Sequence, residues 1–220
     1  MKSYIWTLPT RVFHWLFASF MLIVFLTDDD KLLKYHAIIG YAILVLIIFR
    51  LFWGYFGPKY SKFKDFTANK KSIKDFIKNI FNKNQNYVGH NPLASLVMLG
   101  MFIVSLLAIF TGIVVYGAEE HKGILSFLNS SFFKSFDDIH EFFANFIIFL
   151  VVLHLIGIFI DKTLHAKHET VNSIFTGYKK FDTKEDIRLN IFQKGLALLF
   201  FITLIIFTIY NFTSNSIFIT

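Results

Sequence analysis

Five long apolar stretches constrain the fold of this 220-residue chain more than any other feature of its sequence. A helix that crosses a bilayer needs roughly 17–25 mostly apolar residues. The first stretch reaches this length by including Ile5 to Leu8, and the second carries Arg50 near its end, where a long side chain can reach the interface. We therefore predict an all-α membrane protein with about five transmembrane helices, near 12–27, 37–56, 93–118, 139–160 and 196–213.

The composition agrees with a membrane protein and excludes several kinds of metal site. The chain is 55% hydrophobic and 17% charged, whereas soluble domains are usually about 45–50% apolar and about 25% charged. It has no cysteine, which excludes disulfides, thiolate metal sites, iron–sulfur clusters and c-type haem attachment. The first apolar stretch ends in Asp28, Asp29 and Asp30 without a small-residue cleavage pattern, so we do not expect a cleaved signal peptide.

The charges predict the orientation of the chain in the membrane. Nine Lys or Arg and two acidic residues lie between Arg50 and Pro92, and seven basic and five acidic residues lie in 161–194. The links 27–36 and 117–138 are acidic. Because basic loops concentrate on the cytoplasmic side, we expect the N-terminus to be cytoplasmic and the C-terminus periplasmic. Membrane topology accounts for the net charge of +7, so we expect no nucleic-acid partner.

The Lys-rich segment 58–91 has two readings. Its apolar residues Phe66, Ile73, Phe76, Ile77 and Ile80 have the spacing of an amphipathic helix on the inner membrane surface. The alternative is a solvated linker with a turn or two of helix. At its end, the Asn-Pro pair at 91–92 predicts a helix start, because Asn caps well and Pro fits the first turn.

Four histidines lie in or at the ends of the predicted spans: His14, His36, His140 and His154. His140 and His154 are fourteen residues apart on one helix, which places them within roughly 40° of the same face and about 21 Å apart along the axis. His140 is then near the outer surface with His36, and His154 nearer the inner surface with His14. The sequence therefore predicts one histidine pair at each of two levels.

Two imidazoles from facing helices can bind one porphyrin iron from opposite faces. Two such layers would carry electrons across the bilayer. Gly40, four residues after His36, lacks a side chain and would let a flat macrocycle approach the backbone, although close helix packing explains glycines as well. No Asp or Glu lies deep in a span to complete a porphyrin-free Zn or Fe site. A proton or ion pathway and purely structural histidines remain alternatives.

Several motifs in order resemble a known family. They are "RVFHW" at 11–15, "HAIIG" at 36–40, "RLFWGYFGPKY" at 50–60, "YVGHNPLASLVML" at 87–99, "TG" at 111–112, "IHEFFANFIIFLVVLHLIG" at 139–157 and "LHAKHETVNSIFTGYKK" at 164–180. Over roughly residues 8–180 the chain is similar to the bacterial cytochrome b561 / nickel–iron hydrogenase b-type cytochrome family. The resemblance implies a four-helix transmembrane bundle that holds two molecules of haem b noncovalently.

The resemblance also implies roles for particular residues. By position, His14 and His154 would bind the inner haem, and His36 and His140 the outer haem. Arg11 and Arg50 match family arginines and would pair with haem propionates at the inner surface, although ordinary positive-inside anchoring explains them equally well. The domain expected from the resemblance is residues 1–185, and 186–220 is expected to add a fifth, C-terminal transmembrane helix that anchors a partner or a second copy in a homodimer.

The expected function is electron transfer across the bacterial inner membrane, between the quinone/quinol pool and a periplasmic c-type cytochrome or oxidoreductase subunit. The short link between the first two helices departs from hydrogenase-type members. A nickel–iron hydrogenase subunit and a stand-alone superoxide:quinone oxidoreductase are the alternatives. The spans contain no nucleophile–base pair, phosphate loop or acid pair, so we expect an electron-transfer subunit rather than a catalyst. A quinone site is expected near His14, His90 and His165, at the inner surface.

Overall fold

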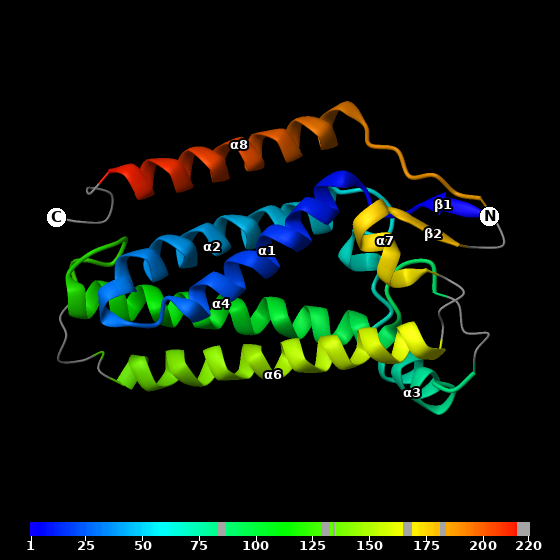
Figure 1. The fold of residues 1–220 in the computed structure, drawn as a ribbon, viewed down its shortest axis with the longest axis horizontal. Coiled ribbons are helices and arrows are strands. Elements are labelled where there is room, and N and C mark those ends of the chain that lie inside the picture. Colours follow the sequence, from blue (N-terminus) through cyan, green and yellow to red (C-terminus); the bar gives the residue numbers. More distant parts are fainter. Residues whose placement is uncertain (83–86, 129–132, 134, 165–168, 181–183, 215–220) are drawn as a thin grey trace. The chain divides into compact units, whose positions relative to one another are not determined.

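Five helices of the computed structural model are long and apolar enough to cross a membrane (Figure 1). The structure describes residues 1–82, 87–128, 133, 135–164, 169–180 and 184–214. The long helices are α1 (Leu8–Leu26), α2 (Leu33–Phe56), α4 (Pro92–Glu120), α6 (Ser135–Leu164) and α8 (Ile191–Thr213). The 3-10 helix η1 (Asp30–Leu32) leads directly into α2. The chain is an all-α, multi-pass membrane protein, as the sequence predicts.

Local sequence sets where several of these helices begin. The Asn91 side chain accepts a hydrogen bond from the Ala94 amide at 2.8 Å, and Pro92 is the first residue of α4, which confirms the predicted start. Before α8, the Asn190 side chain accepts from the Gln193 amide at 2.8 Å, and the Gln193 side chain accepts from the Asn190 amide at 3.1 Å. This reciprocal capping box fixes the first turn of α8.

The chain divides into two compact units, and each long helix contributes to both. Unit 1 comprises Met1–His14, Arg50–Met101 and Phe149–Leu196. Unit 2 comprises Trp15–Phe49, Phe102–Ile148 and Ala197–Thr220. Because α1, α2, α4, α6 and α8 all pass from one unit into the other, the division cuts across helices rather than between them.

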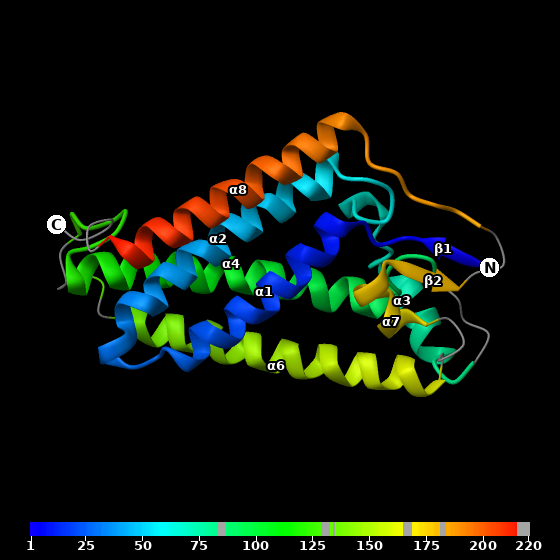
Figure 2. The same cartoon turned by 45° about the horizontal axis from the view of Figure 1, so that its top comes forward.

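A small antiparallel sheet in unit 1 joins distant parts of the sequence (Figure 2). Strand β1 (Lys2–Tyr4) pairs with β2 (Tyr178–Lys180), with Ser3 opposite Lys179. The short helix α7 (Thr170–Thr176) precedes β2 and ends at Gly177, which has a φ of +87°. A side chain at Gly177 would meet the Tyr4 ring and the Trp6 carbonyl, so glycine is required there by both backbone and space.

The Lys-rich segment of unit 1 contains a short 3-10 helix, η2 (Phe63–Asp65), and the helix α3 (Lys70–Lys78). The Asn69 side chain caps α3 by accepting from the Ser72 amide at 2.8 Å. Phe76 is buried and its ring lies 5.7 Å from that of Tyr87, whereas Ile77 on the same helix is half exposed. A nine-residue helix thus forms within this segment and packs Phe76 against the protein, whereas Phe66 and Ile80 lie outside the helix.

Aromatic and small side chains pack the helices of unit 2. The Phe17 and Phe102 rings join α1 to α4 at 6.2 Å, and Phe49 on α2 contacts the Phe200 and Phe201 rings of α8 at 5.6 and 5.0 Å. Ala42 on α2 is fully buried. In unit 1, the Gln193 side chain donates to the Phe56 carbonyl at 2.9 Å. The fifth helix thus packs on α2 in both units.

Two details differ from the sequence-based prediction. Ile5 does not extend the first span, because α1 begins only at Leu8. Instead Ile5 and Trp6 are buried in a cluster with Tyr60 and Val88. The strands β1 and β2 were not predicted either, since three-residue strands leave no usable alternation in the sequence.

Candidate functional site

The unit 2 histidines lie close together and are held by the main chain. His36 on α2 and His140 on α6 have ring centroids 6.1 Å apart, with their planes at 77°. The His36 Nδ1 is 3.0 Å from the Val24 carbonyl, and the His140 Nδ1 is 2.8 Å from the Ala108 carbonyl. A carbonyl only accepts, so each Nδ1 carries the proton and each Nε2 keeps a lone pair for a metal.

The His140 ring packs closely against Gly112 and Thr111 of helix α4. A Cβ on Gly112 would lie 2.8 Å from the His140 Cε1 and 3.1 Å from its Nδ1. The Thr111 hydroxyl lies 3.3 Å from the same Nδ1 and donates to the Leu107 and Ala108 carbonyls at 2.9 Å. Gly112 therefore makes room for the histidine ring itself.

Unit 1 brings together the other two histidines. His14 on α1 and His154 on α6 have ring centroids 6.5 Å apart, with their planes at 52°. Both rings are half-buried. The structure thus brings together the two pairs that the sequence pairs by depth, each pair within a single unit.

The two pairs fit the axial ligation of a haem iron. Two imidazoles on opposite sides of one metal ion, each bound at about 2 Å, place their ring centroids about 6 Å apart. Among the described residues, no group of three or more His, Cys, Asp or Glu is placed to hold a metal ion. A porphyrin supplies the four further nitrogens that a pair of histidines lacks. A Cβ on Gly40, four residues after His36 on α2, would meet no atom within 4 Å.

Cationic side chains of unit 1 lie among aromatic rings and carbonyls. Arg50 is only 5% exposed, and its guanidinium lies 4.9 Å from the Phe63 ring centroid and 5.6 Å from that of Phe66. The Arg11 Nη1 donates to the Phe175 carbonyl. The buried Lys179 amine donates to the Tyr87 carbonyl, and burial lowers its pKa to about 8.

His90 lies against two aromatic rings in unit 1. Its ring centroid is 4.7 Å from that of Trp6 and 5.6 Å from that of Phe66. Burial, and then the positive charges of Arg50 and Lys179, lower the pKa of His90 to about 3, so the ring is neutral at physiological pH. His165, which the sequence placed in the same quinone site, lies outside the described residues, as does His168.

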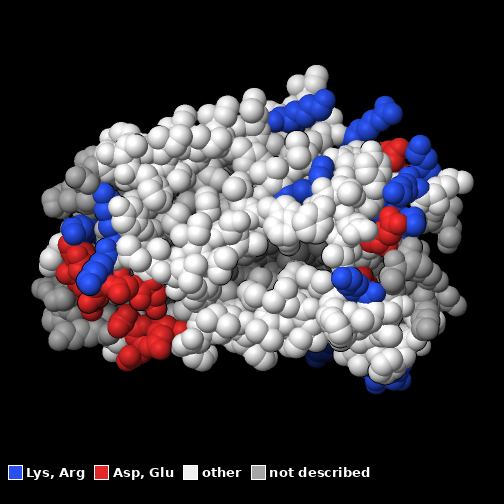
Figure 3. Space-filling model, in the orientation of Figure 1, with Lys and Arg blue, Asp and Glu red and all other residues white. Residues whose placement is uncertain are grey.

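Exposed carboxylates of unit 2 gather in one region of the surface (Figure 3). They follow α1, end α4 and begin α6, where the two acidic links of the sequence join these helices. The region is strongly negative and belongs to the same unit as the His36–His140 pair. Its carboxylates are Asp28, Asp29, Asp30, Glu119, Glu120, Asp137, Asp138 and Glu141.

The chain belongs to the prokaryotic cytochrome b561 family, whose model matches residues 5–177. It is therefore a membrane b-type cytochrome that takes part in electron transfer, and its cofactor is haem b. The matched residues end before α8 (Ile191–Thr213).

Several curated proteins are similar to the chain at low identity. It is 22% identical to the "Probable Ni/Fe-hydrogenase B-type cytochrome subunit" of Rhizobium leguminosarum bv. viciae over 218 residues, which cover 83% of this chain and 91% of that protein. It is 23% identical to the "Probable Ni/Fe-hydrogenase 1 B-type cytochrome subunit" of Escherichia coli (strain K12) over 155 residues, covering 57% and 65%. No solved structure matches the chain with significance.

Sequence reasoning missed the groups that orient the unit 2 histidines. The carbonyls of Val24 and Ala108 have no sequence signature, because every residue carries a carbonyl. Gly112 was noted only as part of the "TG" motif of the family resemblance. A glycine beside a threonine on an otherwise bulky helix was the available signal, and the packing partner could not be read from it.

Proposed function

We propose that this cytochrome transfers electrons across the bacterial inner membrane through two molecules of haem b, each held by one histidine pair. His14 and His154 hold one haem, and His36 and His140 hold the other. The observation that carries the proposal is the ring separation of 6.5 and 6.1 Å in the two pairs. One separation of this kind is unremarkable in a helical protein, whereas two among the three helices α1, α2 and α6 match a diheme arrangement.

Each haem, when bound, supplies reversible one-electron chemistry at its iron. The chain supplies ligands in a fixed tautomer, because the Val24 and Ala108 carbonyls hold the Nδ1 protons of His36 and His140. Such bonds orient a ligating imidazole and raise its basicity. Gly40 leaves room for a macrocycle in unit 2. Arg11 and Arg50 supply positive charge for propionates in unit 1, in keeping with their places in the family-like motifs.

The proposed partners are quinone on one side and a soluble-domain redox protein on the other. The acidic region of unit 2 supports a partner with a basic face, such as a c-type cytochrome, because complementary charge speeds docking. We place this region in the periplasm with the C-terminus, and the N-terminus with the basic loops in the cytoplasm. We propose that quinone binds near His14 and His90, because the Trp6 and Phe66 rings beside His90 offer a flat apolar wall.

The hydrogenase reading is the second candidate, and the names of the relatives favour it. A nickel–iron hydrogenase would then be the electron donor in place of a c-type cytochrome. Residues 1–185 form the diheme domain in either case, and 186–220 add a helix that anchors the partner or a second copy. Co-purification of the tagged chain separates the two, because a hydrogenase carries nickel and a c-type cytochrome carries covalent haem.

The test is the haem content of single ligand variants of the purified full-length protein. We expect two haems per chain in the natural protein and one in His140→Ala or His154→Ala. The two variants should retain different haems, distinguished by redox potential. His121→Ala, outside the proposed ligands, should retain two. Full haem content in both ligand variants, or one haem per natural chain, would contradict the diheme assignment.

A further inference from the structure

A pocket in unit 1 lies where two membrane-spanning helices begin and outside the proposed haem sites. It has a volume of about 310 Å³. The first turn of α1, the first turn of α8 and the extended segment before α8 form its walls. Its lining residues are Tyr4, Thr7, Leu8, Ile187, Arg188, Leu189 and Lys194.

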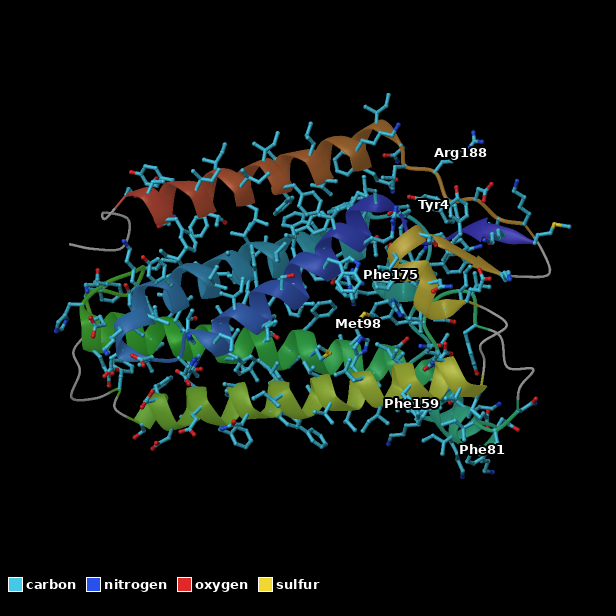
Figure 4. All side chains as sticks on the ribbon, in the orientation of Figure 1. Tyr4, Phe81, Met98, Phe159, Phe175 and Arg188 are labelled. Atoms are coloured by element: carbon cyan, nitrogen blue, oxygen red, sulfur yellow. The ribbon has the colours of Figure 1, made fainter. Side chains whose placement is uncertain are left out.

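The pocket combines two cations with an apolar floor. Arg188 and Lys194 are exposed, and within the part of the chain that the structure describes neither side chain pairs with a carboxylate. Figure 4 shows Arg188 extending from the segment before α8, near the end of the molecule that carries Tyr4. Leu8 is 58% exposed, and Leu189 lines the same pocket. Two cations beside the leucine side chains of Leu8 and Leu189 suit an amphipathic ligand better than a simple ion.

Hydrogen bonds hold the walls of the pocket in place. The Ile187 amide donates to the Tyr4 carbonyl at 2.9 Å, and the Tyr4 amide donates to the Asp186 side chain at 2.9 Å. The Asn190–Gln193 capping box fixes the turn that carries Lys194. The pocket is therefore built into the fold, because its cations stand on a segment that is tied to the N-terminal strand and to a helix cap.

The depth of the pocket relative to the membrane indicates what kind of ligand it binds. Leu8 is the first residue of one candidate span and Ile191, which is 88% exposed, is the first of another. The pocket thus lies at the height where lipid headgroups meet acyl chains. Guanidinium and ammonium groups bind phosphate oxygens strongly, and basic pockets between membrane helices bind anionic headgroups. We propose that this pocket binds the phosphodiester of an anionic phospholipid, with the glycerol and upper acyl carbons against Leu8 and Leu189.

Lipid bound in this pocket would affect the fifth helix, α8, which the family match does not include. Lys194 belongs to α8 and Leu8 to α1, so one lipid would contact both helices and the segment that joins α8 to the rest of unit 1. The lipid would fix the start of α8 in addition to its hydrogen bond to the Phe56 carbonyl. We therefore expect bound lipid to raise the thermal stability of the purified protein.

The test uses the full-length, haem-loaded protein in a neutral detergent. Phosphatidylglycerol, phosphatidylcholine and inorganic phosphate are titrated separately, and bound lipid is counted by native mass spectrometry beside thermal melting. The natural protein should retain phosphatidylglycerol and melt higher with it. R188Q/K194Q should bind phosphatidylglycerol about 25-fold more weakly, from about fivefold for each lost cation, while keeping its haem absorbance. R188K/K194R, which keeps both charges, should retain most of the binding.

K70Q/K71Q is the matched control, because it removes the same charge from exposed lysines on α3 outside the pocket. It should bind phosphatidylglycerol within twofold of the natural protein. If both double variants lost the same phosphatidylglycerol affinity, the lipid would be attracted by overall surface charge, and the proposal of a specific site would be wrong. Equal binding of phosphatidylcholine would show that the pocket does not recognise negative charge. Equal stabilisation by inorganic phosphate would show that the acyl part of the lipid is not needed for binding.

Discussion

The two histidine pairs have almost the same ring separation but very different surroundings. In unit 2, backbone carbonyls of α1 and α4 hold the His36 and His140 rings, and a glycine makes room for one of them. In unit 1 the notable features are side chains: the buried cations Arg50 and Lys179 act on His90, whose ring also lies against those of Trp6 and Phe66.

We therefore expect the unit 2 pair to be controlled mainly by the geometry of the main chain and the unit 1 pair mainly by nearby charges. Main-chain carbonyls cannot be removed by substitution, so the unit 2 pair should be sensitive mainly to changes that push the rings. Side-chain charges can be removed singly, so the unit 1 pair should keep its haem and change its potential or its pH response. Each prediction below tests one side of this contrast.

The largest effect is expected from Gly112→Ala. The new Cβ would lie 2.8 Å from the His140 ring, which the Ala108 carbonyl holds in place, so the ring must shift away from the position in which we propose that it binds haem. Haem content should fall from two to one per chain, measured as the pyridine haemochrome. Gly100→Ala on the same helix is the control, since its Cβ meets only Leu150 at 3.7 Å. Equal haem content in both variants would contradict the claim that Gly112 provides the space needed by the His140 ring.

The next effect is the acid sensitivity of unit 1. The folded-state pKa of His90 is about 3, below its usual value near 6.5, so the unfolded state binds more protons between these values and stability falls as pH drops. From pH 7 to 5 the loss from this group is about 2 kcal/mol. His90→Gln should flatten the decline of the melting temperature over this range, and His121→Gln should not.

A smaller effect is expected from Arg50→Gln. A buried positive charge favours the reduced form of a nearby haem, so removing it should lower the potential of the unit 1 haem by some tens of millivolts. The unit 2 potential should stay the same. Redox titration followed in the visible spectrum measures both, with Lys70→Gln as an exposed charge control. A shift confined to the other haem would reverse the assignment of Arg50.

The smallest effect is expected from Thr111→Val. Its hydroxyl is a secondary neighbour of the His140 Nδ1 at 3.3 Å, whereas the Ala108 carbonyl is closer at 2.8 Å. Both haems should remain, with less than about 1 kcal/mol of lost stability. Thr163→Val, which removes an exposed helix-to-carbonyl bond on α6, provides the comparison. Loss of a haem would mean that the hydroxyl, rather than the carbonyl, orients the ring.

The spans and the histidine pairs could be predicted because their signals are periodic and long. Helices of about 20 apolar residues are visible in composition alone, and the 3.6-residue repeat relates His140 to His154. The cap at Asn91 is a local rule of three residues. Each of these depends on neighbours in the sequence or on one straight helix.

The contacts that could not be predicted join residues far apart in the chain. The Arg50 guanidinium lies over the Phe63 and Phe66 rings of the following segment, and no local pattern specifies that fold-back. The position of the His140 ring depends on Gly112, which lies 28 residues earlier on another helix. Such packing is set by the tertiary structure, where individual residue propensities carry little information.

The pairing of β1 with β2 has a consequence for how the chain can be threaded. Four candidate spans, α1, α2, α4 and α6, lie between the two strands. Strands can exchange hydrogen bonds only on the same side of a bilayer, so the number of crossings between Tyr4 and Tyr178 must be even. If one helix failed to cross the membrane during insertion, β1 and β2 would lie on opposite sides of the bilayer and the sheet could not form.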